Sequence, residues 1–115
     1  MDNTRLDKLF AKHDIKPENI VCVSHSGKHT LFHLLDGQEI HSTAMFKEVR
    51  EYLSPDIFWN IQKGVLVNRH YVVHIDKNAV YTMVNNMSFK GRGRLPSEHS
   101  NRRIELEMKK LQEHQ

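Results

Sequence analysis

The sequence predicts a mainly β domain: short antiparallel strands in small packed sheets, with one short central helix and a helix at each end. Short apolar, β-branched runs such as Ile20–Ser24 recur through the chain. Turn-forming pairs, Asp36-Gly37 and Asn85-Asn86, separate these runs. Apolar residues with helical spacing occur only near the two ends and at residues 46–53.

Length and composition indicate one globular domain. A chain of 115 residues suits a single core, and 38% hydrophobic with 27% charged residues is typical of a folded protein. No apolar run approaches the roughly 20 residues that cross a bilayer, so we expect no membrane insertion. The single cysteine, Cys22, allows no internal disulfide and favours a reducing, cytoplasmic location.

Residues 1–19 form an expected N-terminal helical extension. Leu6, Leu9 and Phe10 give residues 2–13 one apolar stripe, and Asp2 or Asn3 is expected to cap the helix. Pro17 then ends any helix.

The main domain, residues 20–96, is expected to open with three strands and a helix. The predicted strands span residues 20–24, 29–35 and 38–42, with a turn at 25–28 and a two-residue hairpin at Asp36-Gly37. Ser42-Thr43 is expected to cap a helix of about ten residues. Its apolar stripe comprises Phe46, Val49, Tyr52 and Leu53.

Residues 58–76 combine two apolar runs with a polar insert, Gln62-Lys63-Gly64. Asn68 interrupts the second run, and we interpret it as structural, with an amide that satisfies buried backbone groups at a bend. Phe58, Trp59 and Tyr71 are interpreted as core residues. A last strand pair, residues 79–84 and 87–90, turns at Asn85-Asn86.

Residues 90–103 form a basic run, in which Glu98 is the only acidic residue. Its cations are Lys90, Arg92, Arg94, Arg102 and Arg103. Arginines between glycines can approach a phosphate backbone closely, which favours nucleic-acid binding. Residues 97–115 are expected to form a C-terminal helix. Its apolar stripe, Ile104, Met108 and Leu111, would dock either on its own sheet or on a second copy of the chain.

The order of these features resembles LytTR-type DNA-binding domains of bacterial transcription factors. F-W-x-I-x-K-x-x-L-V-N begins at Phe58, H-Y-V and I-D follow it, and a D-G hairpin and the helix M-F-K-E-V-x-x-Y-L precede it. The resemblance covers about residues 20–94. It implies sequence-specific binding to double-stranded DNA, with loops inserted into successive major grooves, often at paired direct repeats in promoters.

The resemblance also implies partners and a mode of control. Binding would involve a homodimer, or two adjacent monomers, on DNA. Family members usually carry a receiver domain in front, and the roughly twenty residues before this domain are too few for one. We therefore expect a stand-alone regulator that receives its signal through a regulatory partner on another chain.

The resemblance implies three DNA-contact regions. The first comprises Ser26, Lys28 and His29; the second is Lys63 with Gln62; the third comprises Lys90, Arg92 and Arg94. The family often has His where this chain has Gln62, and Gln can read an adenine edge. Arg69, next to Asn68, is expected to contact phosphate. The alternative for Lys63 is a solvated lysine at a strand end.

No metal site, cofactor or catalytic activity is expected. His25, His29 and His33 recur at four-residue spacing, but Gly27 interrupts that strand and no zinc motif is present. The chain also lacks a nucleophile elbow and a P-loop. The main alternative is a protein-interaction module whose terminal helices bind a partner, such as a membrane inhibitor, with an incidental basic surface. A third interpretation is RNA binding through aromatic residues on the sheet.

Overall fold

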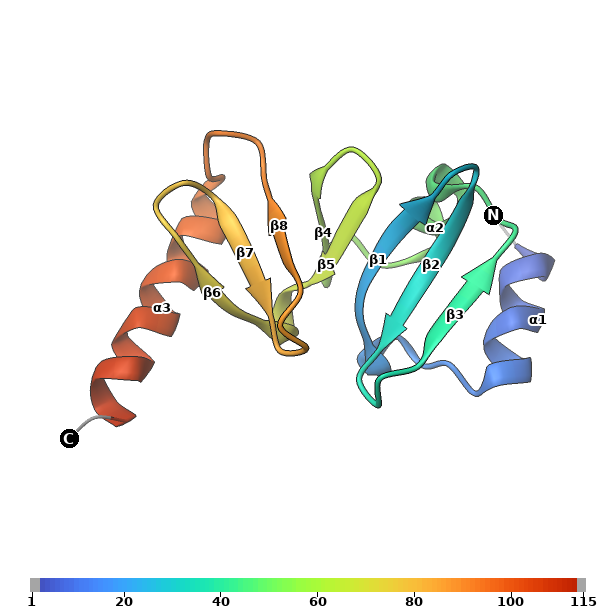
Figure 1. The fold of residues 1–115 in the computed structure, drawn as a ribbon, viewed down its shortest axis with the longest axis horizontal. Helices are drawn as coiled ribbons and strands as arrows, with labels where there is room; N and C mark the ends of the chain where they lie inside the picture. The colour runs from blue at the N-terminus through green and yellow to red at the C-terminus, as the bar shows by residue number, and fades with distance from the viewer. Residues whose placement is uncertain (1–2, 114–115) are drawn as a thin grey trace.

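The computed structural model describes residues 3–113, and within them it contains two antiparallel sheets and three α-helices (Figure 1). This confirms the predicted fold class. In chain order the elements are α1 (Thr4–His13), β1 (Ile20–Ser26), β2 (His29–Leu34), β3 (Glu39–Ser42), α2 (Phe46–Tyr52), β4 (Phe58–Gln62), β5 (Val65–Asn68), β6 (Val72–Ile75), β7 (Val80–Met83), β8 (Ser88–Lys90) and α3 (Ser97–Glu113). Short 3-10 turns cover Pro17–Asn19 and Arg69–Tyr71.

The larger sheet has the strand order β3-β2-β1-β5-β4, and the smaller has the order β6-β7-β8. Every strand pair is antiparallel. The order places β5 next to β1, although β2, β3, α2 and β4 lie between them in the sequence. The turns that follow β1 and β4 therefore come to the same end of the larger sheet (Figure 1).

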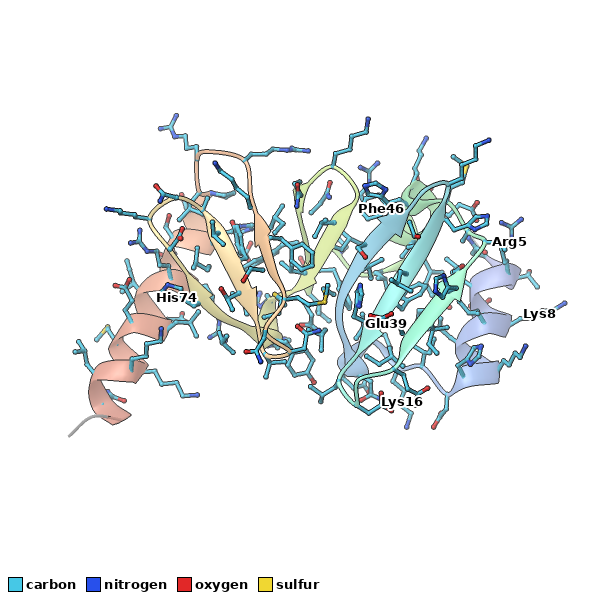
Figure 2. The ribbon with its side chains drawn as sticks, viewed as in Figure 1. Arg5, Lys8, Lys16, Glu39, Phe46 and His74 are labelled. Carbon is cyan, nitrogen blue, oxygen red and sulfur yellow. The ribbon has the colours of Figure 1, made fainter. Side chains whose placement is uncertain are left out.

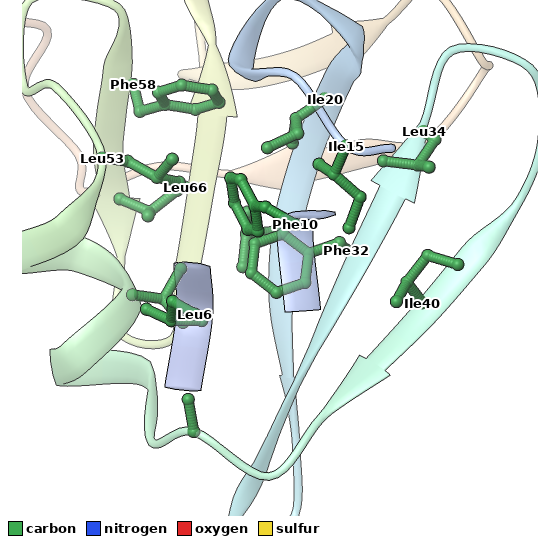
Figure 3. Packing of buried hydrophobic residues seen from close by; sticks show 13 residues of the cluster. Leu6, Phe10, Ile15, Ile20, Phe32, Leu34, Ile40, Leu53, Phe58 and Leu66 are labelled. Atoms are coloured by element: carbon green, nitrogen blue, oxygen red, sulfur yellow. The ribbon is translucent and has the colours of Figure 1, made fainter. Parts of the chain in front are cut away.

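One core lies between the larger sheet and the helices α1 and α2 (Figure 3). The predicted stripe of α1 supplies Leu6 and Phe10, and the Phe10 ring packs edge-on against Phe32 of β2 at 5.5 Å between centroids. Asn3 caps α1 by accepting a hydrogen bond from the Leu6 N–H at 3.1 Å. The alternative cap, Asp2, lies outside the described residues.

A second core lies on the other face of β1, β4 and β5, against the smaller sheet and α3. β5 is buried on both faces: Leu66 packs in the first core, whereas Val65 and Val67 pack in the second. This accounts for its continuous apolar run. Trp59 and Leu106 also belong to the second core, so α3 docks on its own chain near its middle.

The structure corrects several local predictions. β1 extends to Ser26, and the loop at Asp36-Gly37 is longer than a two-residue hairpin, because β2 ends at Leu34 and β3 begins at Glu39. The helix α2 is shorter than expected and begins after Met45, not after Thr43. The reason is that the Ser42 hydroxyl accepts a hydrogen bond from the Ala44 N–H at 3.0 Å and so shapes the loop before the helix.

The apolar stripe predicted on α3 does not dock on its own sheet, whereas its docking on a second copy of the chain stays a prediction. Ile104, Met108 and Leu111 are 56%, 58% and 69% exposed. The helix packs instead through His99 and Leu106, which are buried. Helical spacing occurs on both faces of α3, and spacing alone does not tell which face meets the sheet.

Candidate nucleic-acid interface

Three loops lie along the upper edge of the molecule as drawn in Figure 1. They are the β1–β2 turn at Gly27-Lys28, the β4–β5 turn at Lys63-Gly64, and residues 91–96 between β8 and α3. We call these three segments the loop edge. They contain or adjoin all three contact regions that the sequence predicts.

Backbone hydrogen bonds attach the middle loop to its two neighbours. The His25 N–H donates to the Gly64 carbonyl at 3.0 Å, and the Arg92 N–H donates to the Ile61 carbonyl at 3.1 Å. The loop edge is therefore a joined structure rather than three independent turns.

The β4–β5 turn is also braced from within. Gly64 adopts a φ of +78°, which favours glycine. The Asn60 side-chain amide donates to the carbonyls of Gln62 and Val65 at 2.8 and 2.9 Å. These bonds close the turn from which the exposed Lys63 side chain projects, and Gln62 lies beside it, half-buried.

The third loop begins at a close contact. The Gly91 N–H donates to the Ala79 carbonyl at 2.7 Å, and a Cβ at Gly91 would lie 2.7 Å from Cε1 of Tyr81. Only glycine fits this approach without movement of the ring. The backbone is thus held in place immediately before Arg92.

A hollow of about 700 Å³ separates the first two loops from the start of α2. Its wall carries three lysines, Lys28, Lys47 and Lys63, and two histidines, His25 and His29. None of the described residues that line it is acidic. We call it the basic hollow. Phe46, labelled in Figure 2, contributes an apolar part of its wall.

The basic side chains on the loop edge, together with Lys47 of the basic hollow and Lys90 at the end of β8, are exposed and lack counter-charges. Among the side chains described by the structure, no acidic group forms an ion pair with any of them. The set comprises Lys28, Lys47, Lys63, Lys90, Arg92 and Arg94. Nitrogen-tipped side chains project from this edge in Figure 2. Ser26 and His29 are exposed beside them.

Arg69 does not lie at the loop edge, and its expected phosphate contact stays a prediction. It follows the other end of β5, because Phe58 pairs with Asn68 there and Gln62 pairs with Val65 at the turn. Its guanidinium pairs with Glu98 at 3.1 Å. Arg102 and Arg103 are likewise paired, with Glu105 and Glu107. The basic run of the sequence is therefore divided between two regions.

The structure confirms the interpretation of Asn68 as a structural residue. The residue is 1% exposed, its amide donates to the Ile20 carbonyl at 2.9 Å, and its side-chain oxygen accepts from the His70 N–H at 3.0 Å. One backbone group at the start of β1 and one at the bend after β5 are thereby satisfied.

Other candidate side chains are buried in the core. Cys22 packs in β1, where burial raises its thiol pKa to about 12. Burial also lowers the pKa of His33, against a smaller opposing effect of Glu39, and its ring shares a hydrogen bond of 3.0 Å with Ser24. His33 thus lies apart from the exposed His25 and His29. Within residues 3–113, no three side chains of metal-binding type form a cluster.

Sequence reasoning did not single out Lys47. Lys47 joins the basic hollow because the loop before α2 brings the first turn of that helix beside the β1–β2 turn. The loop residue Thr43 lines the same hollow. Neither the spacing nor the composition of residues 42–53 indicates that the first turn of α2 lies beside the β1–β2 turn.

Comparisons with known proteins agree with this geometry. A family model of the LytTr DNA-binding domain matches residues 11–112. Among solved structures, one described as the LytTr DNA-binding domain of a response regulator from Bacillus cereus has a similar fold, with a TM-score of 0.60 and 14% sequence identity. The match covers 65% of this chain and 72% of that chain. No curated protein matches.

One further observation concerns membranes. Within the described range, residues 3–113, no helix is long and apolar enough to span a bilayer.

The family model matches most of the chain, and the fold agrees with that of a solved LytTr domain. We therefore conclude that the chain belongs to the LytTR family of DNA-binding domains, which function in transcription regulation.

Proposed function

We propose that the chain binds double-stranded DNA sequence-specifically at a promoter element, through the loop edge. The observation that carries this proposal is the set of exposed cations without counter-charges on three joined loops. Lysine and arginine side chains at such an edge gain phosphate partners and release counterions from DNA.

The dimensions of the molecule support contact with more than one groove. Its longest axis, with α3 at one end and α1 at the other, measures 47 Å, and the three loops lie along the middle part of it (Figure 1). Successive major grooves on one face of B-DNA lie about 34 Å apart. We therefore propose that the β1–β2 turn and residues 91–96 enter successive major grooves, with the β4–β5 turn between them.

Within this interface, base readout is assigned to the loop tips. Lys63 can donate to guanine O6 and N7, and Gln62 can pair with an adenine edge. Ser26, His29 and Arg92 have exposed side chains suited to the same role. Lys28, Lys47, Lys90 and Arg94 are assigned to phosphates, where they supply affinity and its salt dependence.

The test begins with selection of bound duplexes from a random pool, which supplies a specific site. Binding of Lys63→Ala is then measured on this site and on a scrambled duplex. A base contact predicts a loss of about 1–3 kcal/mol on the selected site alone. Equal losses on both duplexes would make Lys63 a phosphate contact, and failure to enrich any duplex would contradict sequence-specific binding.

A second function, self-association on DNA or docking of a regulatory partner, has one observation in its favour. Ile104, Met108 and Leu111 form an exposed apolar stripe on α3, a helix otherwise lined by charged residues. Analytical ultracentrifugation with and without the selected duplex tests self-association. A dimer that dissociates in Ile104→Ser/Leu111→Ser would support it, and a monomer under both conditions would contradict it.

A further inference from the structure

The first two loops of the loop edge are in contact through His25 and Gly64. β1 and β5 pair as far as Ser24 and Val65, and the next residue on each strand forms this contact. A Cβ built at Gly64 would lie 2.0 Å from Cδ2 of His25 and 2.8 Å from Cγ. The imidazole therefore occupies the space that any other residue at position 64 would need.

The contact depends on the shape of the ring. Among described residues, the His25 imidazole has no side-chain hydrogen-bond partner, and the backbone bond to Gly64 would remain with another side chain at position 25. The ring is not enclosed, since His25 as a whole is exposed. The ring contributes a packing contact with the Gly64 backbone.

This contact lies between two lysines of the basic hollow. His25 precedes the turn that carries Lys28, and Gly64 directly follows Lys63. Lys28 and Lys63 lie far apart in the sequence, and both line the hollow together with His25 and Gly64. Because polar readout requires side chains held within about 0.5 Å of the productive geometry, the relative position of the two turns matters for recognition.

We propose that His25 is a positioning residue for DNA recognition. Its ring, seated on Gly64, holds the β1–β2 and β4–β5 turns at a fixed separation, so that Lys28 and Lys63 engage the DNA as one unit. This inference rests on the proposed function, because it concerns the same interface. It assigns His25 a role through packing rather than through its ring nitrogens.

The chain offers matched variants for the test. His25→Phe keeps a flat ring over Gly64 and removes both ring nitrogens, whereas His25→Ala removes the ring. Gly64→Ala places a methyl group where the ring lies. Gly37→Ala is its control, because Gly37 lies in the β2–β3 loop outside the loop edge and also has a positive φ, +94°, but an added Cβ would meet nothing within 4 Å.

Each variant is titrated against the selected and the scrambled duplex at one salt concentration. We expect His25→Ala and Gly64→Ala to lose about tenfold or more on the selected duplex, the size of one lost base contact, with little change on the scrambled duplex. His25→Phe and Gly37→Ala should remain within about threefold of the unmodified protein. Thermal unfolding shows that each variant is folded.

A double variant and a DNA-free readout complete the experiment. His25→Ala should cost little more when Lys63→Ala is already present, because the ring acts through that loop. In the free protein, His25→Ala should shift the amide NMR resonances of Lys63 and Gly64, whereas His25→Phe should shift them much less.

The outcomes separate this inference from the proposed function. If His25→Phe loses as much as His25→Ala, the ring nitrogens contact DNA and the positioning role is wrong. If Lys63→Ala weakens specific binding and His25→Ala does not, the positioning role alone fails. If Lys63→Ala has no effect on either duplex, the proposed role of Lys63 in DNA binding fails instead.

Discussion

The two ends of the β4–β5 hairpin carry similar polar residues in opposite surroundings. At the turn, Lys63 is exposed and forms no ion pair with any described side chain. At the other end, Asn68 is 1% exposed with its amide bonded to backbone, and Arg69 pairs with Glu98. Burial and counter-charge therefore distinguish a polar residue that stabilises the fold from one that is available to a partner.

The largest effect that this contrast predicts is on stability, at Asn68. Asn68→Ala leaves the Ile20 carbonyl and the His70 N–H without their partners. We expect a loss of roughly 1–3 kcal/mol in the free energy of unfolding, because the Ile20 carbonyl is a buried group left unsatisfied, whereas the bond to the His70 N–H is only partly buried. Urea unfolding followed by circular dichroism measures it.

Asn60→Ala is the matched control for this prediction, since the Asn60 side chain also forms two hydrogen bonds to the backbone, both to carbonyls and both at the half-buried turn end. Its cost in stability should be smaller, because water can replace the lost bonds. Equal losses for the two variants would remove the proposed distinction between the two ends of the hairpin.

The second prediction concerns pH at the end of the hairpin away from the turn. His99 of α3 stacks on Trp59 with ring centroids 3.8 Å apart, and its Nδ1 lies 2.6 Å from the Tyr81 hydroxyl. Burial raises the pKa of Tyr81 to about 12, so the hydroxyl stays protonated and shares this hydrogen bond with the imidazole. Burial lowers the pKa of His99, and the Glu98 carboxylate opposes this only in part.

The folded-state pKa of His99 therefore lies below its unfolded value, about 6.5. Its stabilising contribution is complete above that pH and is lost as pH falls through the folded pKa. The free energy of unfolding should decrease as the pH is lowered from 7.5 to 5.5. The decrease should be less steep for His99→Phe than for the unmodified protein. His33, whose pKa is also lowered, should account for part of the slope that remains. If the free energy of unfolding depended on pH as steeply in His99→Phe as in the unmodified protein, the assignment of this dependence to His99 would be contradicted.

The smallest expected effect is at Arg69. Its ion pair with Glu98 joins side chains that are 42% and 58% exposed, and such pairs contribute about 0–1 kcal/mol. Arg69→Ala should leave both unfolding and DNA affinity almost unchanged in the same urea and duplex titrations. A loss of DNA affinity comparable to that of Lys63→Ala would place Arg69 at the interface after all.

Local patterns predicted much of this molecule. The alternation of short apolar runs with turn pairs predicted the antiparallel sheets, and the isolated polar position in Val65–Asn68 predicted a structural asparagine. The start of α2 was missed because the Ser42 hydroxyl bonds within the preceding loop rather than capping a helix. The contact of His25 with Gly64 was missed because it depends on the pairing of β1 with β5, which no local pattern encodes.

The central claim is that unpaired cations on the loop edge, and not total positive charge, bind the DNA. Two triple variants remove equal charge: Lys28→Ala/Lys63→Ala/Arg92→Ala on the loop edge, and Arg69→Ala/Arg102→Ala/Arg103→Ala among the ion-paired residues. The measurement is the slope of log affinity against log salt concentration for a duplex. We expect the loop-edge variant to lower the magnitude of this slope by about 3, close to one per lost contact, and the other to leave it unchanged. Equal changes in the two variants would contradict the claim.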